Sequence, residues 1–429
     1  MWQTDFPVGR VSDLLRPVKR LVKPSAASNF QLAGVRLYGN GLRSQGEFAG
    51  ADLKTPSLNR VESGDVLYNK MWASKGAFGV VPDAFSGYHV TSEYPLFRTL
   101  NSDPAYIRQL FARQRFWKLA EIWSSGSTDR TRLNPKDFLA LPVPLPPLQE
   151  QAAIGLCLDR LDEKIDAAGS LVKSLERAKR DALRRLLTLG MKGDAAELTP
   201  LTENWVLGRI AESVEAIPKD WKLVQLTKYA KLESGHTPSR NHPEYWEGDI
   251  PWVSLQDAEH MKGLRLTQTK STIGPLGLAN SSARMMPAGT VVFQRTASVG
   301  LSCILEVASA TSQHFANWIC GEDLSPRYLN QVFRHMQREW RRLQAGSVLP
   351  DIYMPTFKKL QILLPSVGEQ EAIADVGEAF DQRIAAERAA LAELRASKDA
   401  LAQELLSGRV RLPEATIRRL ASTDHAEAS

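Results

Sequence analysis

Only three cysteines occur in this chain of 429 residues, and they lie far apart. Cys157, Cys303 and Cys320 form no CxxC pair, so the sequence indicates neither a disulfide framework nor a zinc knuckle. The chain has no run of about 18 apolar residues that could span a bilayer, and its first residues lack the basic-then-apolar order of a signal peptide. We therefore expect a cytoplasmic protein with no membrane partner.

Motifs for nucleotide binding and for catalysis on DNA are missing as well. The chain contains no GxxxxGK[ST] phosphate loop, no Asn-Pro-Pro-aromatic tetrapeptide of the adenine methyltransferase type and no Pro-Asp…Glu-x-Lys nuclease cluster. Gly39-Asn40-Gly41 is too short for a cofactor fingerprint and predicts a loop, and His236 and His242 have no further metal ligands beside them. The sequence therefore predicts no catalytic, cofactor-binding or metal-binding residue in this chain.

Positive charge is concentrated in two parts of the chain. Residues 1–145 carry 19 Lys and Arg against 12 Asp and Glu, and residues 206–364 carry 18 against 14. The other segments are acidic, with 9 against 10 in residues 146–205 and 8 against 12 in residues 365–429. This distribution favours a polyanionic partner for the basic regions and a different partner for the acidic ones, over the alternative that the charge serves solubility alone.

The most specific signal is a segment that occurs twice at a fixed offset of 219 residues. The matched residues include Leu145-Pro146 with Leu364-Pro365, Glu150-Gln151 with Glu369-Gln370, Asp162 with Asp381, Lys179 with Lys398, and Leu186-Leu187 with Leu405-Leu406. A register kept over this length indicates an internal duplication of structure.

Each copy has apolar residues at alternating steps of four and three, which is the spacing of a coiled-coil seam. The expected seam residues are Ile154, Leu158, Leu161, Ile165, Leu175 and Leu186 in the first copy, and Ile373, Phe380, Ile384, Leu391, Leu394 and Leu405 in the second. Prolines precede each helix, and Gly190 and Gly408 are suitable helix stops. We favour two long helices that pair antiparallel over the alternative, in which each amphipathic helix lies on its own globule.

The regions before the two helices are also alike, because Gly64-Asp65-Val66-Leu67-Tyr68 resembles Gly289-Thr290-Val291-Val292-Phe293. Short β-branched and aromatic runs between Gly, Pro and Asn predict mixed α/β globules, with helices over 104–123 and 326–344. The predicted fold is α+β, with two mixed α/β globules separated by two long antiparallel coiled-coil helices as a pseudo-twofold internal repeat. The expected boundaries are 1–145 and 217–364 for the globules, 146–190 and 365–408 for the helices, 191–216 for a linker and 409–429 for a C-terminal tail.

The junction sequences LPVPLPPLQEQAAI and LQILLPSVGEQEAI, each leading into a heptad helix, resemble those of specificity subunits of type I restriction-modification systems. The resemblance covers essentially the whole chain, and a motif found twice at this separation is specific. In the second globule IPKDWKLVQL, SGHTPSR and GDIPWVSLQD also resemble the target-recognition pattern of the family. The first globule departs from it, with GVRLYGNGLRSQG where a Gly-x-Thr-Pro is expected.

The resemblance implies a non-catalytic subunit that reads a bipartite site in double-stranded DNA, with each globule acting as a target-recognition domain for one half-site. It implies two adenine methyltransferase subunits as partners, and two ATP-dependent translocase and nuclease subunits in a larger assembly. S-adenosylmethionine, ATP and Mg²⁺ would be bound by those partners and not by this chain.

Side chains that could reach base edges and phosphates occur in polar stretches of both globules. The candidate DNA-contacting residues are Arg43, Gln45, Asn69, Lys70 and Lys75 in the first globule, and Thr237, Ser239, Arg240, Asn241, Arg295, Thr296, Gln313 and His314 in the second.

Two other classes of function remain open from the sequence. The chain could be a DNA-modifying enzyme in itself, which the missing motifs disfavour. It could also be a coiled-coil DNA-binding regulator or scaffold, whose helices mediate assembly without site-specific reading. Copurification separates these classes, because a specificity subunit is expected to bring a methyltransferase with it.

Overall fold

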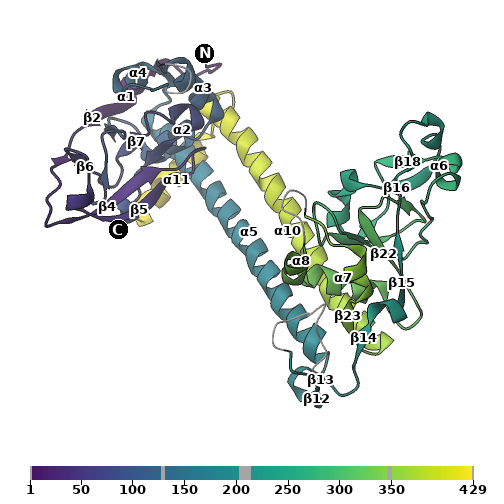
Figure 1. Ribbon diagram of the computed structural model, residues 1–429. Coiled ribbons are helices and arrows are strands. Elements are labelled where there is room, and N and C mark those ends of the chain that lie inside the picture. The colour runs from purple at the N-terminus through teal and green to yellow at the C-terminus, as the bar shows by residue number, and fades with distance from the viewer. Residues whose placement is uncertain (1, 127–130, 202–213, 345–349, 428–429) are drawn as a thin grey trace. The chain divides into compact units, whose positions relative to one another are not determined.

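The computed structural model describes residues 2–126, 131–201, 214–344 and 350–427. The chain forms two compact units, of which unit 1 comprises Met1–Gly169 and Ala390–Ser429, and unit 2 comprises Ser170–Ala389. Each unit contains one globule and one segment from each of two long helices, α5 (Leu148–Leu189) and α10 (Val367–Ser407) (Figure 1). Within the described ranges, no helix is long and apolar enough to cross a bilayer.

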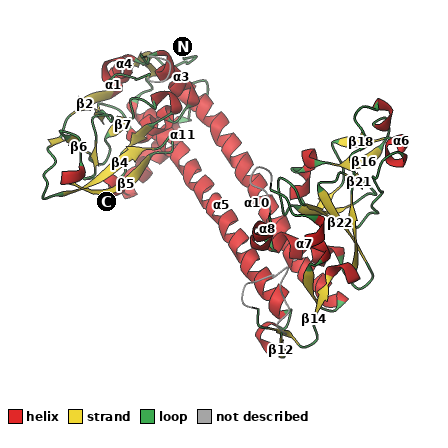
Figure 2. Ribbon diagram, in the orientation of Figure 1, coloured by secondary structure: helices red, strands yellow, loops and turns green. Residues whose placement is uncertain are grey.

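The globule of unit 1 is built on two larger sheets and short helices (Figure 2). One sheet has the strand order β2-β10-β7-β8 and the other the order β3-β6-β9-β4-β5, while β1 pairs with β11. The strands are β1 (Val8–Arg10), β2 (Leu15–Val18), β3 (Leu21–Val22), β4 (Asn29–Val35), β5 (Leu42–Ala49), β6 (Leu58–Arg60), β7 (Val66–Tyr68), β8 (Phe78–Val80), β9 (His89–Val90), β10 (Leu96–Thr99) and β11 (Pro142–Pro144). The helices are α1 (Val11–Leu14), α2 (Pro104–Phe111), α3 (Gln114–Ile122), α4 (Pro135–Ala140) and α11 (Glu414–Glu427).

The globule of unit 2 has a sheet of order β15-β22-β19-β20-β17, a second of order β18-β16-β21, and the pairs β14-β23 and β12-β13. The strands are β12 (Leu198–Pro200), β13 (Ala216–Pro218), β14 (Lys222–Gln225), β15 (Ala230–Ser234), β16 (Ile250–Val253), β17 (Arg265–Leu266), β18 (Ser271–Ile273), β19 (Val291–Gln294), β20 (Ser302–Leu305), β21 (Ala310–Thr311), β22 (Phe315–Cys320) and β23 (Gln361–Leu364). The helices are α6 (Pro275–Ala279), α7 (Pro326–His335), α8 (Gln337–Leu343) and α9 (Met354–Lys358).

The stretches 104–123 and 326–344, each predicted as one helix, are each divided in two. In unit 1 the break between α2 and α3 places Phe111 and Phe116 in one stacked pair, with ring centroids 4.3 Å apart. Residues five positions apart lie on different faces of a continuous helix, so burial of both rings in one core requires the break. The corresponding break in unit 2 lies between α7 and α8.

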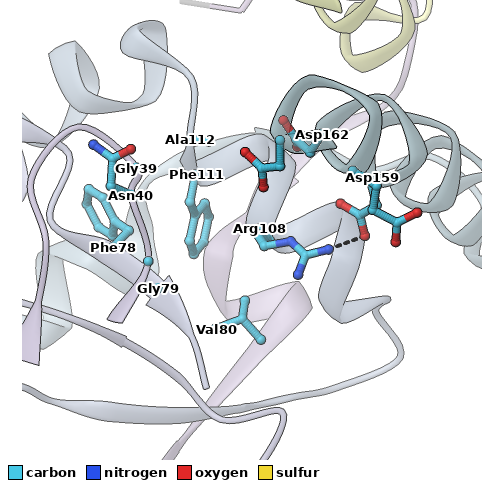
Figure 3. A pocket seen from close by; sticks show the side chains of 13 residues that line it. Gly39, Asn40, Phe78, Gly79, Val80, Arg108, Phe111, Ala112, Asp159 and Asp162 are labelled. Carbon is cyan, nitrogen blue, oxygen red and sulfur yellow. Dashed lines mark hydrogen bonds and ion pairs between the residues drawn. The ribbon is translucent and has the colours of Figure 1, made fainter. Parts of the chain in front are cut away.

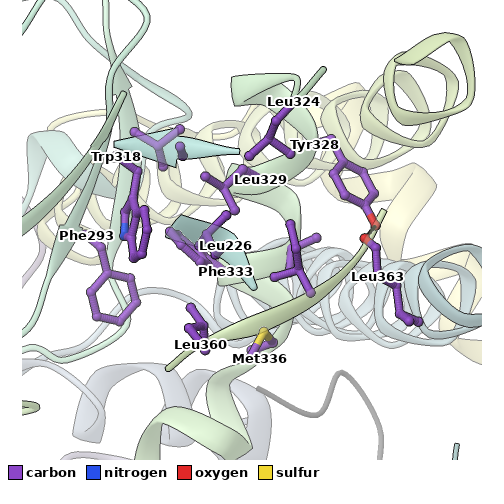
Figure 4. Close-up of a cluster of buried hydrophobic side chains, with 14 of the residues drawn as sticks. Leu226, Phe293, Trp318, Leu324, Tyr328, Leu329, Phe333, Met336, Leu360 and Leu363 are labelled. Atoms are coloured by element: carbon purple, nitrogen blue, oxygen red, sulfur yellow. Dashed lines mark hydrogen bonds between the residues drawn. The ribbon is translucent and has the colours of Figure 1, made fainter. Parts of the chain in front are cut away.

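Each unit has a core of aromatic and aliphatic side chains that includes both long helices. The core of unit 1 takes Ile154 from the start of α5 and Leu405 from the end of α10; α2 also reaches α5 through an ion pair between Arg108 and Asp159 (Figure 3). The core of unit 2 surrounds Phe333 of α7 (Figure 4) and takes Leu187 from the end of α5 and Ile373 from the start of α10. Within each unit the two helix segments therefore run antiparallel.

The expected seam residues are all withdrawn from solvent, some completely and others in part. Those that are buried are Ile154, Leu158, Ile165, Ile373, Ile384, Leu391 and Leu405, and those that are half-buried are Leu161, Leu175, Leu186, Phe380 and Leu394. Near the end of α5, Leu183 and Leu187 are buried in the core, and Leu186 packs against it half-buried. An α-helix turns about 20° per heptad away from a strict seven-residue repeat, which accounts for such a shift along a long helix. Gly190 and Gly408 follow the two helices with φ of 70° and 75°, a left-handed conformation that suits glycine.

The repeated Glu-Gln pair joins each globule to its long helix. The Gln151 amide, 4% exposed, accepts a hydrogen bond from the Asp103 N–H (3.2 Å) and donates one to the Pro146 carbonyl (2.9 Å). In unit 2 the fully buried Gln370 accepts from the Ser325 N–H (2.8 Å) and donates to the Pro365 carbonyl (3.0 Å). Since Asp103 and Ser325 are the N-cap residues of α2 and α7, the glutamine ties the start of the globule helix to the start of the long helix in both units.

A second repeated contact, which we call the Gln-Asp-Lys bridge, joins the globule to both long helices. In unit 1 Asp162 of α5 accepts hydrogen bonds from the Gln109 amide (2.8 Å) and from the Lys398 ammonium of α10 (2.6 and 2.7 Å). In unit 2 Asp381 accepts from the Gln331 amide (3.1 Å) and lies 2.6 Å from the Lys179 ammonium. Each pair therefore joins an aspartate of one repeat to a lysine of the other.

Replacing Asp381 with Asn should lower the free energy of unfolding of unit 2 by about 1–3 kcal/mol, because a polar group that is mostly buried loses its charged partner. The side chains of Lys179 and Asp381 are only 14% and 16% exposed. Burial lowers the pKa of the Lys179 ammonium, and Asp381 raises it again in part. Denaturant unfolding followed by circular dichroism measures the loss.

The double variant K179M/D381L tests whether the loss is caused by an unpaired charge. It removes the ammonium and the carboxylate together and should recover part of the stability, while the Gln331 amide and Arg334 still lose an acceptor. The exposed pair of Arg418 and Glu414 supplies the control, since E414Q should change stability by less than about 0.5 kcal/mol. A double variant as unstable as D381N would contradict the charge-pairing account.

Candidate nucleic-acid interface

In unit 2 four of the sequence-predicted residues come together at one cavity of about 300 Å³. Thr237, Arg240, Gln313 and His314 line it, and Trp252 and Ser312 are lining residues that the sequence did not single out. The Ser312 side chain is 1% exposed, and its hydroxyl has no hydrogen-bond partner among the described residues. Trp252 lies within GDIPWVSLQD, but nothing in the local sequence indicates that the loop before β22 approaches it.

Gln313 is the exposed residue of this cavity whose position is most firmly fixed. Its side-chain oxygen accepts a hydrogen bond from the Thr237 hydroxyl (2.5 Å), and its carbonyl accepts one from Nε of Arg295 (3.1 Å). The amide NH₂ group of Gln313, an exposed residue, forms no hydrogen bond with the described residues. A glutamine held in this way presents donors to a base edge without first losing its side-chain freedom.

Arg295 and Thr296 are engaged inside the globule. The Arg295 side chain is 16% exposed and donates to both Asp351 carboxylate oxygens (2.8 and 2.9 Å), and the Thr296 hydroxyl donates to the same carboxylate (2.7 Å). Their geometry suits a role in positioning the Gln313 loop. Burial lowers the pKa of His314, and the nearby Arg295 acts in the same direction against the smaller opposing effect of Asp351.

Ser239, Arg240 and Asn241 form an exposed turn beside the cavity. The Asn241 N–H donates to the Ser239 hydroxyl (3.3 Å), and the Arg240 guanidinium lies 4.8 Å from the ring centroid of Trp246. Stacking on tryptophan holds a guanidinium in place while leaving its charge available to phosphates or bases.

In unit 1 the sequence-predicted residues form two separate groups. Arg43 and Gln45 are exposed on β5, where Gln45 is the extra residue of an irregularity in the pairing with β4. In the segment after β7, Asn69 accepts hydrogen bonds from the Met71 and Trp72 N–H groups, and Lys70 donates to the Ser92 carbonyl (2.7 Å). Lys75 is exposed. Arg43, Gln45 and Lys75 are therefore the members of this set whose side chains are available to a ligand.

The amino-acid sequence matches the family described as "Type I restriction modification DNA specificity domain" twice, over residues 53–177 and 218–396. Each match includes most of one globule and a part of the long helix that follows it. The chain belongs to this family.

Relatives within the family are specificity subunits. The MjaIX specificity subunit of Methanocaldococcus jannaschii is 31% identical over 170 residues, which cover 39% of this chain and 39% of that protein. The HindI specificity subunit of Haemophilus influenzae is 21% identical over 370 residues, which cover 73% of this chain and 80% of that protein. The crystal structure of the type I restriction-modification system S subunit from M. genitalium shares the fold, with a TM-score of 0.55 and 12% identity over 94% of this chain and 96% of that one. These comparisons confirm the family and the fold predicted from the sequence.

For this specificity subunit, Q313A should reduce the preference of the assembled complex for its own DNA site by about 1–3 kcal/mol, the worth of a good contact to a base edge. Competition between specific and unrelated duplexes at fixed salt measures the preference. The exposed Gln268 lies outside the cavity and supplies a matched control, since Q268A should leave the preference unchanged. Equal effects of the two variants would show that Gln313 does not read a base.

Proposed function

We propose that this specificity subunit reads a bipartite site in double-stranded DNA, with the globule of unit 1 contacting one half-site and that of unit 2 the other. The observation that carries this proposal is the duplication: each unit has its own core, its own Glu-Gln junction and its own Gln-Asp-Lys bridge. The basic composition of both globules supports contact with phosphates.

The proposed partners are two adenine methyltransferase subunits and, in a larger assembly, two ATP-dependent translocase and nuclease subunits. The names of the relatives support a place in a restriction enzyme. S-adenosylmethionine, ATP and Mg²⁺ belong to those partners in this proposal. The chain itself contributes sequence recognition and no catalytic residue.

Mapping of methylated adenines in the source genome, with and without this gene, tests the proposed function. Loss of the gene should remove methylation from one bipartite sequence and leave all other methylated sequences unchanged. The purified chain alone should neither transfer methyl groups nor cut DNA. Either activity in a preparation free of partner subunits would instead support a DNA-modifying enzyme, and unchanged methylation would support a scaffold.

Exchange of residues 217–364 for the corresponding globule of a related specificity subunit should change one half of the methylated sequence and preserve the other. The physical reason is that the core of each globule is closed within its own unit. Methylation mapping of the exchanged protein gives the result directly. A change in both halves would rule out one reader per globule.

Binding of the assembled complex to DNA should weaken steeply as salt rises from about 50 to 200 mM, because lysines and arginines that contact phosphates release condensed counterions. The slope of log affinity against log salt measures the number of phosphates neutralised. R240A should reduce that slope if Arg240 contacts a phosphate, whereas E121Q, a charge change on the exposed side of α3, should not. An affinity that is flat over this range would contradict a phosphate-contacting role for the globules.

A further inference from the structure

The sequences of the globule helices α2 and α7 align at an offset of 222 residues. Tyr106 and Tyr328 correspond, and each hydroxyl donates to a strand carbonyl before the long helix, that of Pro144 (3.0 Å) or of Leu363 (2.8 Å). Gln109 and Gln331 of the two bridges correspond as well. On the same register the residue one turn further on is Ala112 in unit 1 and Arg334 in unit 2.

In unit 2 the Arg334 guanidinium is held by oxygen atoms on several sides. It donates to the Gly263 and Ser302 carbonyls (both 3.1 Å) and to the Lys262 carbonyl (3.0 Å), and it lies 4.0 Å from the Asp381 carboxylate. The side chain is only 21% exposed. A planar fork of donors suits such a set of carbonyl and carboxylate oxygens.

In unit 1 the corresponding position is a cavity of about 370 Å³, lined in part by Ala112 (Figure 3). Two lining residues are counterparts of residues around Arg334. Phe78 pairs with Tyr68 across the sheet as Ser302 pairs with Phe293, and Asp162 corresponds to Asp381. The Gly39–Gly41 loop also lines the cavity. Gly39 has a φ of 70° and a Cβ there would lie 3.1 Å from Cα of Ala112, so this loop approaches α2 as closely as only glycine allows.

The cavity is also acidic along the face that α5 presents to it. Asp159, Asp162, Glu163 and Asp166 line it at steps that place them on one side of a helix. Arg108 pairs with Asp159, and Lys398 with Asp162. Glu163 and Asp166 are exposed and form no ion pair within the part of the chain that the structure describes. Two carboxylates therefore face the cavity without a cation.

We propose that this cavity, which we call the cation seat (Gly39–Gly41, Phe78–Val80, Arg108, Phe111, Ala112 and the four acidic residues of α5), binds an arginine side chain of a partner polypeptide. Unit 2 fills the corresponding position with its own Arg334, which shows that this part of the repeated scaffold accommodates a guanidinium. Unit 1 has the matching tyrosine, glutamine and aspartate (Tyr106, Gln109 and Asp162) and a small residue in place of the arginine. Two of its carboxylates form no ion pair with the described residues. Arginine is favoured over lysine because its fork can bond a carboxylate and a carbonyl together.

The test uses the full-length chain and the peptide N-acetyl-Gly-Arg-Gly-amide, followed by titration calorimetry. The matched peptide with citrulline in place of arginine has almost the same shape but no charge. The arginine peptide should bind one site per chain, at least tenfold more tightly than the citrulline peptide. A112R places a guanidinium into the seat from this chain itself, and should abolish binding while leaving the thermal midpoint unchanged or raised.

Two further variants keep the test decisive if A112R does not fold. E163Q/D166N should weaken the arginine peptide at least tenfold, whereas E121Q, on the exposed side of α3, should leave it unchanged. R334A opens the corresponding position in unit 2, where Gln382 and Ala385 stand in place of Glu163 and Asp166, and should therefore leave the number of bound peptides at one. Equal binding of the two peptides, or binding that survives both A112R and E163Q/D166N, would overturn the proposal. Absence of binding to the unmodified chain would overturn it too, and would indicate a seat filled by an arginine of this chain. None of these outcomes depends on DNA recognition.

Discussion

The rest of this structure depends on two lysine–aspartate ion pairs between the long helices. A lysine ammonium held between two helices needs a carboxylate beside it, and the repeat provides such a pair in each unit. An apolar seam alone allows two helices to slide by a heptad, since one layer of leucines resembles the next. The Lys398–Asp162 and Lys179–Asp381 pairs remove this freedom, because a shift would leave charged groups without partners in a partly dry environment. The same aspartates accept the glutamines of α2 and α7, so the register of the helices and the placement of each globule on them are fixed by one contact.

The strongest sequence signal of the family has a structural explanation that does not involve DNA. Gln151 and Gln370 are buried, and each joins the start of a globule helix to the start of a long helix. Their neighbours Glu150 and Glu369 make different contacts. Glu150 forms an ion pair with Arg411, and Glu369 accepts a hydrogen bond from the Trp221 indole N–H (2.9 Å). The glutamine therefore makes the same contacts in both units, and its role is to attach the globule helix to the long helix. It says nothing about which bases the globule reads.

Features that depend on periodic spacing could be predicted from the sequence, whereas features that depend on contacts through space could not. The heptad pattern predicted both long helices and a seam that the structure keeps from solvent. The repeat matched Lys398 with Lys179, but the contact between Lys398 and Asp162 is apparent only in the structure. Arg295 was an attractive DNA candidate because it follows an apolar strand. Its partner Asp351 lies 56 residues further along the chain, and no local sequence pattern predicts this contact. The breaks after Phe111 and His335 were missed for the same reason, since core packing and not helix propensity places them.

An internal repeat offers a comparison that a single globule cannot, because each contact in one unit can be checked against its counterpart in the other. Contacts present in both units, such as the tyrosine hydroxyls on Pro144 and Leu363, belong to the scaffold. Positions where the units differ while their surroundings agree are not required by the scaffold. Ala112 in unit 1, which corresponds to Arg334 in unit 2, is one such position. The segments that carry Gln313 and Arg43 differ even more. Gln313 lies in the loop between β21 and β22, whereas Arg43 lies on strand β5, and the sheets of the two units have different strand orders. In the proposed division of labour, recognition can change in one globule without disturbing the other, because each unit has its own core and its own Gln-Asp-Lys bridge.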